Sequence, residues 1–142
     1  DARAAFLGIN ASTTKKQIVR AALESVAFQM VVYLEFLQRD NKFELKNLIV
    51  DGGMIKNKLF LQMIADLLKI EIMVPDIEEM SLYGALLFGI QHQKKISELS
   101  DLNKYAVKRK TIKCHKNQGI LRSYQNWKKL IDIHFISNQE KN

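Results

Sequence analysis

A buried strand that runs directly into two glycines and then into a helix constrains this fold more than any other feature. Residues 47–51 (NLIVD) hold three consecutive apolar side chains, two of them β-branched, as is typical of a strand covered on both faces. Gly52 and Gly53 follow at once, and Asn57 opens a predicted helix over 58–68. One stripe of that helix is apolar: Leu59, Phe60, Met63, Ile64, Leu67 and Leu68.

Similar runs recur, so that strands and helices alternate along the first 90 residues. The sequence predicts strands at 4–10, 47–51 and 70–74, and helices at 14–39, 58–68 and 82–90. Ser81 is the expected cap of the last helix, in which Gly84 and Gly89 indicate close backbone packing. Buried strands alternating with helices predict the α/β class, built around a largely parallel sheet.

The helix predicted over 14–39 is apolar on two opposite faces. Ser12, Thr13 and Thr14 supply candidates for its N-cap. One face carries Val19, Leu23, Val26, Ala27, Met30, Leu34 and Leu37, and the other carries Ile18, Ala21, Ala22, Phe28, Val32 and Phe36. A surface helix has one apolar face only. We therefore expect this helix to be buried on two sides and a partner domain to cover one of them.

The basic character of the chain lies in its last third. The net charge is +7, yet residues 1–90 carry 10 basic and 11 acidic side chains, whereas residues 91–142 carry 12 and 4. A basic run over 104–116 could attract nucleic acid or anionic lipid, but no recognition motif accompanies it, so we do not expect nucleic acid as a partner. The tail also predicts a strand at 105–112 and a helical stripe that docks on the body: Tyr124, Trp127, Leu130, Ile131, His134 and Phe135.

Cysteine use and hydropathy suggest a cytoplasmic protein. Cys114 is the single cysteine, so no internal disulfide forms and a reducing compartment is expected. The longest uncharged run of the first helix lies between Glu24 and Glu35, which is too short to span a membrane. No Cys or His spacing predicts a metal site. Because the first residue is Asp1, we expect a fragment of a longer chain.

The loop after the first buried strand is the candidate binding site. Glycines let a ligand approach the backbone, the following helix start presents free N–H groups, and ligands bind beyond the carboxyl ends of strands in open α/β sheets. Asn57 could contact a base or ribose, and Asp51 could hold a magnesium-bound water or cap the turn. A purely structural turn, with Asn57 as an N-cap, explains the same residues, so both interpretations stay open.

Several blocks of this sequence resemble the C-terminal domain of glycerol kinases, members of the FGGY family of carbohydrate kinases. The blocks are residues 1–8 (DARAAFLG), 20–29 (RAALESVAFQ), 50–54 (VDGGM) with Asn57, 62–68 (QMIADLL), 75–89 and 124–129 (YQNWKK). They cover nearly the whole chain in order. The resemblance implies an actin-like (ribonuclease H-like) ATPase lobe over residues 1–142, with a basic tail from about residue 91.

The resemblance also implies a function. ATP, with Mg²⁺, would bind here through Gly53 and Asn57, with Gly52 supporting the turn, and glycerol would be the substrate. The catalytic aspartate and the glycerol site belong to family segments upstream of residue 1, so no catalytic and no metal-ligating residue is expected in this chain. Its main partner would be the N-terminal lobe of the same polypeptide, with no membrane partner; a homo-oligomer stays open.

The sequence departs from the family pattern at a few positions. Residues 80–86 read MSLYGAL, so that Tyr83 and Leu86 replace smaller residues near the expected nucleotide site, and Ala4 replaces a glycine. These departures leave two alternatives. The chain could belong to another FGGY sugar kinase, or it could be a non-catalytic interaction module that uses its basic tail.

Overall fold

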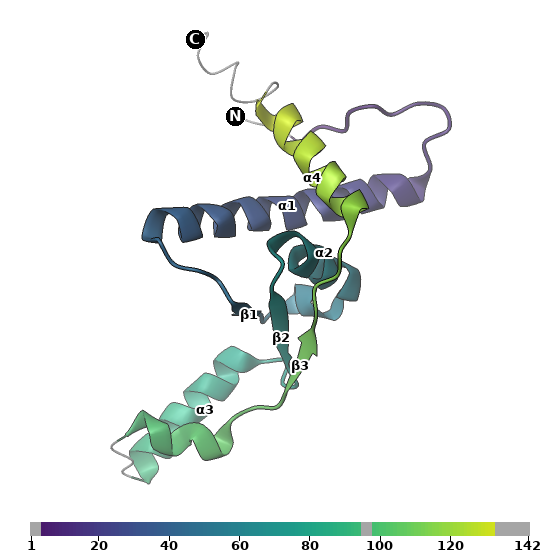
Figure 1. The fold of residues 1–142 in the computed structure, drawn as a ribbon. Helices are drawn as coiled ribbons and strands as arrows, with labels where there is room; N and C mark the ends of the chain where they lie inside the picture. The colour runs from purple at the N-terminus through teal and green to yellow at the C-terminus, as the bar shows by residue number, and fades with distance from the viewer. Residues whose placement is uncertain (1–3, 95–97, 133–142) are drawn as a thin grey trace, which may run out of the picture.

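The computed structural model describes residues 4–94 and 98–132, which form a small sheet flanked by helices (Figure 1). This arrangement confirms the predicted α/β class. The elements in chain order are α1 (Lys15–Asn41), β1 (Asn47–Ile49), the 3-10 helix η1 (Gly53–Lys56), α2 (Lys58–Leu68), β2 (Glu71–Pro75), α3 (Met80–Gln93), the 3-10 helix η2 (Leu99–Tyr105), β3 (Arg109–Ile112) and α4 (Gln118–Ile131).

The sheet has the order β1-β2-β3 and is mixed rather than largely parallel. β1 pairs in parallel with β2, with Asn47 opposite Glu71, and β3 pairs antiparallel with β2, with Ile72 opposite Ile112. The strand predicted at 105–112 is present only over its second half, because β3 begins at Arg109. Because α2 connects two parallel strands, the carboxyl ends of β1 and β2 lie at one edge of the sheet.

The core lies between the sheet and the helices α1, α2 and α4. Helix α2 contacts both the sheet and α1, and supplies the largest share of the buried side chains. On α1, Phe28 packs against two aromatic rings of α4, with centroid distances of 5.4 Å to Tyr124 and 5.6 Å to Trp127. The helical stripe predicted for the tail thus docks on the body; its members His134 and Phe135 lie outside the described residues.

Helix α1 has a recognisable cap at each end. The Thr14 side chain accepts from the Gln17 backbone N–H, and the Gln17 side chain accepts from the Thr14 N–H, which completes a capping box. At the other end Lys42 adopts the left-handed conformation that terminates many helices. The helix predicted over 14–39 is confirmed with ends shifted by one or two residues.

Helix α1 is buried over a narrow strip that includes residues of both predicted faces. Ala27, Phe28 and Val31 are buried, whereas Val19, Val26, Met30, Val32, Tyr33 and Phe36 are exposed. The prediction of burial on both sides is thus not met by the described residues, because α2 and α4 contact α1 there but leave these six side chains exposed. By length and composition alone α1 could also cross a membrane, contrary to our estimate from its charges. The core helix of a globular domain passes the same test when it is mostly buried, whereas only 17% of the tested α1 window is buried within the described residues.

The strand predicted at 4–10 is wrong. The segment is irregular, and Phe6, Leu7 and Ile9 are each about half exposed. A strand requires a neighbouring strand for its backbone hydrogen bonds, and within the described residues none lies beside this segment. The apolar run is real, but it has nothing here to pair with.

Helix α3 begins earlier than predicted and is more exposed. Its N-cap is Glu79, which makes no side-chain capping bond, and Ser81 lies inside the helix instead of capping it. A Cβ added at Gly84 or Gly89 would meet no atom within 4 Å, so the expected close packing is absent from the described residues. In Figure 1, α3 and η2 lie together at the far end of the sheet, away from α1.

Tyr105 joins η2 to α3. The Tyr83 hydroxyl donates to the Tyr105 carbonyl, and Lys94 Nζ donates to the Tyr105 hydroxyl at 3.0 Å. This bond from Lys94 lowers the pKa of Tyr105, and the positive charges of Lys94 and Lys104 act in the same direction. Tyr83, which departs from the glycerol kinase pattern, thus contacts Tyr105 through its hydroxyl. Lys104, which belongs to the basic run, lies over the ring of Tyr105.

Candidate functional site

The candidate loop lies at the sheet edge where ligands bind in α/β folds. The last bond of the β1–β2 ladder runs from the Val50 N–H to the Met73 carbonyl at 3.1 Å, and the chain then leaves the sheet. A single 3-10 turn follows, with hydrogen bonds from Ile55 N to Gly52 O at 3.2 Å and from Asn57 N to Met54 O at 3.0 Å. The loop is thus a short, hydrogen-bonded turn between a parallel strand and a helix N-terminus.

The two glycines of this loop have different roles. Gly52 has φ +100°, a conformation that side chains rarely adopt, so the turn itself requires glycine there. Gly53 has no positive φ, and an added Cβ would meet nothing within 4 Å. The fold of the described residues therefore explains Gly52 and does not require Gly53. An exposed glycine that packing does not require leaves room for a ligand close to the backbone.

Asn57 caps α2 and keeps one polar group free. Its side-chain oxygen accepts from the Phe60 backbone N–H at 3.1 Å, which confirms the N-cap interpretation. Within the described residues its Nδ2 has no acceptor. Both interpretations of Asn57 thus fit one geometry, because the oxygen stabilises the helix while the amide N–H₂ faces solvent as a donor.

Asp51 and Lys56 complete the loop. Asp51 is exposed, and its carboxylate accepts no hydrogen bond within the described residues, so the predicted role as a cap of the turn is wrong. Lys56 Nζ lies 3.0 Å from Glu78 Oε2, in the turn between β2 and α3. Sequence reasoning missed this ion pair, which joins the two loops that follow β1 and β2.

The described residues hold no group of three or more His, Cys, Asp or Glu side chains that could bind a metal ion. Cys114 is exposed, and the neighbouring His115 lies near a single carboxylate.

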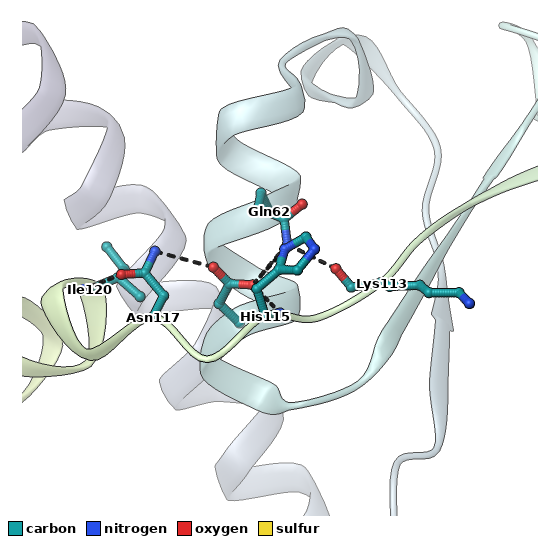
Figure 2. A network of polar contacts seen from close by, with 6 residues as sticks. Gln62, Lys113, His115, Asn117 and Ile120 are labelled. Atoms are coloured by element: carbon teal, nitrogen blue, oxygen red, sulfur yellow. Dashed lines mark hydrogen bonds and ion pairs between the residues drawn. The ribbon is translucent and has the colours of Figure 1, made fainter.

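Among the described residues Asp66, near the C-terminal end of α2, forms the most connected polar centre. Figure 2 shows its partners Gln62, His115 and Asn117. Its side chain is only 2% exposed and accepts from Gln62 Nε2 at 2.7 Å, from the His115 backbone N–H at 2.8 Å and from Asn117 Nδ2 at 3.2 Å. Asn117 in turn caps α4 through the Ile120 N–H. This network fixes the start of α4 against α2, so Gln62 and Asp66, which helped to carry the family resemblance, serve packing.

Comparison with known proteins identifies the family. Residues 1–91 match the C-terminal domain of the FGGY family of carbohydrate kinases. The chain belongs to this family. As an FGGY kinase domain, it has the actin-like ATPase fold of its structural neighbours, and the predicted resemblance to the C-terminal domain of glycerol kinases is confirmed.

The most similar relatives of this FGGY domain include bacterial glycerol kinases. A glycerol kinase of Francisella tularensis subsp. holarctica is 31% identical over 132 residues, which cover 92% of this chain and 26% of that protein. A glycerol kinase of Deinococcus radiodurans is 45% identical over 84 residues, 59% of this chain and 17% of that protein. The chain thus spans about a quarter, or less, of the length of these relatives.

Solved structures give the same picture. The glycerol kinase of Plasmodium falciparum, solved with ADP, superposes on this chain with a TM-score of 0.80 at 28% sequence identity. The superposition covers 95% of this chain and 27% of the Plasmodium chain. A xylulose kinase from Lactobacillus acidophilus has a TM-score of 0.72 at 17% identity, over 96% of this chain and 29% of that chain, and shows the shared fold alone.

Proposed function

We propose that this chain is the nucleotide-binding part of an ATP-dependent glycerol kinase, which converts glycerol to glycerol 3-phosphate. The observation that carries this proposal is Gly53, an open, exposed glycine that the fold does not require, set between a parallel strand and the N-terminus of α2. Similarity to glycerol kinases over 92% of the chain supports the choice of glycerol, and the ADP in the Plasmodium structure supports a nucleotide.

In this proposal the loop binds ATP, and the residues that carry out phosphoryl transfer lie upstream of residue 1 in the same polypeptide. The nucleotide lies against the backbone of Gly52 and Gly53, where no Cβ intervenes, and Asn57 Nδ2 donates a hydrogen bond to it. The positive end of the α2 dipole favours the negatively charged ligand. Phosphoryl transfer depends chiefly on such positioning and on charge stabilisation. The catalytic aspartate and the glycerol site belong to the N-terminal lobe and preceding segments that the resemblance implies.

Mg²⁺ would reach the site with the phosphates of ATP, because Mg²⁺ in kinases binds few carboxylates and several phosphate oxygens. The described residues contain no cluster of His, Cys, Asp or Glu side chains that would form a separate magnesium site. We therefore assign no reaction step to Mg²⁺ bound by these residues. Since ATP is the second substrate, we propose a cytoplasmic location.

The test is glycerol-dependent ATP consumption by the full-length protein with two variants of Asn57. Asn57→Ser keeps an N-cap oxygen and removes only the amide donor, whereas Asn57→Ala removes both. We expect both variants to raise the KM for ATP by about three- to tenfold, as loss of one hydrogen bond predicts, with the KM for glycerol unchanged. Only Asn57→Ala should lower the melting temperature. Equal effects on both KM values would contradict the nucleotide role.

The same assay decides the substrate. Xylulose, ribulose and gluconate are offered beside glycerol. Turnover with one of these sugars and not with glycerol would keep the fold and the nucleotide loop but reassign the substrate. No turnover with any of them would favour the alternative of a non-catalytic module.

A further inference from the structure

The turn between β2 and α3 is held from both sides by ion pairs. Glu78 pairs with Lys56 of the candidate nucleotide loop at 3.0 Å, and Asp76 pairs with Lys110 of β3 at 2.8 Å. The Asp76 backbone N–H also donates to the Lys108 carbonyl at 2.9 Å, so this turn is anchored on β3 by its backbone as well. Lys56 therefore ties the loop after β1 to a turn that the sheet already fixes.

The loop has few other restraints. Gly52, Gly53 and Met54 are exposed, and no side chain of the described residues lies within 4 Å of a Cβ position at either glycine. Ile55 packs against the core, and Asn57 caps α2 through the Phe60 N–H. Besides these and the two internal 3-10 hydrogen bonds, the Lys56–Glu78 pair is the side-chain contact within the described residues that joins this loop to the β2–α3 turn. Exposed ion pairs contribute little to global stability. This one adds a restraint on the exposed side of a short loop that is otherwise held by Ile55 and by its two ends.

We propose that Lys56 and Glu78 are positioning residues for the nucleotide loop. Their ion pair holds η1 against the β2–α3 turn, so that the backbone at Gly53 and the Asn57 amide are already in place when the nucleotide arrives. Neither side chain contacts the nucleotide in this role. The inference rests on the proposed function for its effect on ATP, and on the structure alone for its effect on the loop.

Charge signs separate this role from direct attraction of ATP. If Lys56 attracted the phosphates, Lys56→Met would raise the KM for ATP and Glu78→Gln would lower it, because an anion would be removed from the site. A positioning pair predicts that both variants raise the KM, since either one releases the loop. The exchanged pair Lys56→Glu with Glu78→Lys then restores the contact and the KM.

The experiment measures two quantities in the full-length protein. The first is the hydrogen exchange of the Ile55 and Asn57 amides without nucleotide, which reports the opening of η1. The second is the KM for ATP. We expect Lys56→Met and Glu78→Gln each to accelerate this exchange and to raise the KM about two- to fivefold, the range that exposed ion pairs imply, and the exchanged pair to return both values toward wild type.

Lys110→Met and Asp76→Asn are the matched controls. They break an exposed ion pair of the same turn and change the same charges, but they leave the contact to the loop intact. We expect neither to alter the exchange of η1 nor the KM. Unchanged exchange in the Lys56 and Glu78 variants, opposite effects on the KM, or equal effects of the controls would overturn the inference. Wild-type protein without any turnover would instead refute the proposed function, and the exchange data would still decide the role of the pair.

Discussion

Tyr124 on α4 donates a 2.8 Å hydrogen bond to the Glu35 carboxylate on α1, across 89 positions of the chain. Lys128 Nζ lies 3.4 Å from the same carboxylate oxygen, so a single acidic side chain of α1 receives two partners from α4. Around this polar contact the rings of Phe28, Tyr124 and Trp127 pack together. This is where the last helix is attached to the first.

This bond predicts a loss of stability in alkali. Burial of the phenol raises the pKa of Tyr124 above its ordinary value, and the hydrogen bond to Glu35 and its charge act in the same direction. Because the folded state holds this proton more tightly, the contribution is complete below the ordinary pKa of about 10 and is lost as the pH rises beyond it. We expect urea midpoints, followed by tryptophan fluorescence, to decrease as the pH rises from about 10 to about 11. Tyr124→Phe should reduce this fall, and Tyr33→Phe, an exposed position on α1, should not.

The aromatic contact predicts a large difference between two phenylalanines of the same helix. Phe28 is 2% exposed, whereas Phe36 is 48% exposed. Phe28→Ala leaves a cavity beside Tyr124 and Trp127, and we expect it to lower the free energy of unfolding by about 4 kcal/mol. Phe36→Ala should cost less than about 1 kcal/mol. Chemical denaturation of both variants tests this order, and similar losses would contradict the described packing of α1.

The Asp66 network predicts that one buried carboxylate fixes α4. Asp66→Ala leaves the amides of Gln62 and Asn117 and the His115 backbone N–H without their acceptor. We expect a loss of about 3 kcal/mol, because bonds to a buried charged group are strong. Asp40→Ala, an exposed aspartate near the end of α1, is the control and should be close to neutral. The readout is the melting temperature, and equal shifts in both variants would refute the role of the network.

The two loop glycines predict opposite phenotypes. Gly52→Ala places a side chain at φ +100° and should lower the free energy of unfolding by about 1–2 kcal/mol. Gly53→Ala meets no atom of the described residues, so stability should be unchanged while the affinity for ADP falls at least tenfold. Calorimetric binding of ADP and thermal unfolding together measure both quantities. Normal ADP binding by the Gly53 variant would remove the observation on which the proposed function depends.

The sequence predicted those elements whose pattern is local. The helix at 58–68, its cap at Asn57 and the cap at Thr14 follow from neighbouring residues, and the structure agrees with each. The segment 4–10 failed because an apolar run does not say whether a partner strand exists. Ser81 failed as a cap because α3 begins two residues earlier than predicted, after Glu79, whose side chain makes no capping bond.

The candidate site was predictable only in part. Gly52 and Gly53 stand out in the sequence, but their different backbone angles, and hence their different roles, do not. The contact between Lys56 and Glu78 spans 22 positions and joins two exposed side chains, so no periodicity or burial pattern signals it. The same holds for the hydrogen bonds that Asp66 accepts from the His115 backbone N–H and from Asn117 Nδ2, which span 49 and 51 positions.

The separation of Glu35 and Tyr124 also has a consequence for synthesis. During translation α1 leaves the ribosome long before α4 exists, and even α2 follows only after the intervening loop and β1. The face of α1 that carries Ala27, Phe28 and Val31 therefore stays uncovered while most of the chain is made, and closing the contact requires a long loop. The sequence order of these helices thus leaves this face of α1 without its full set of native contacts until α4 has been synthesised.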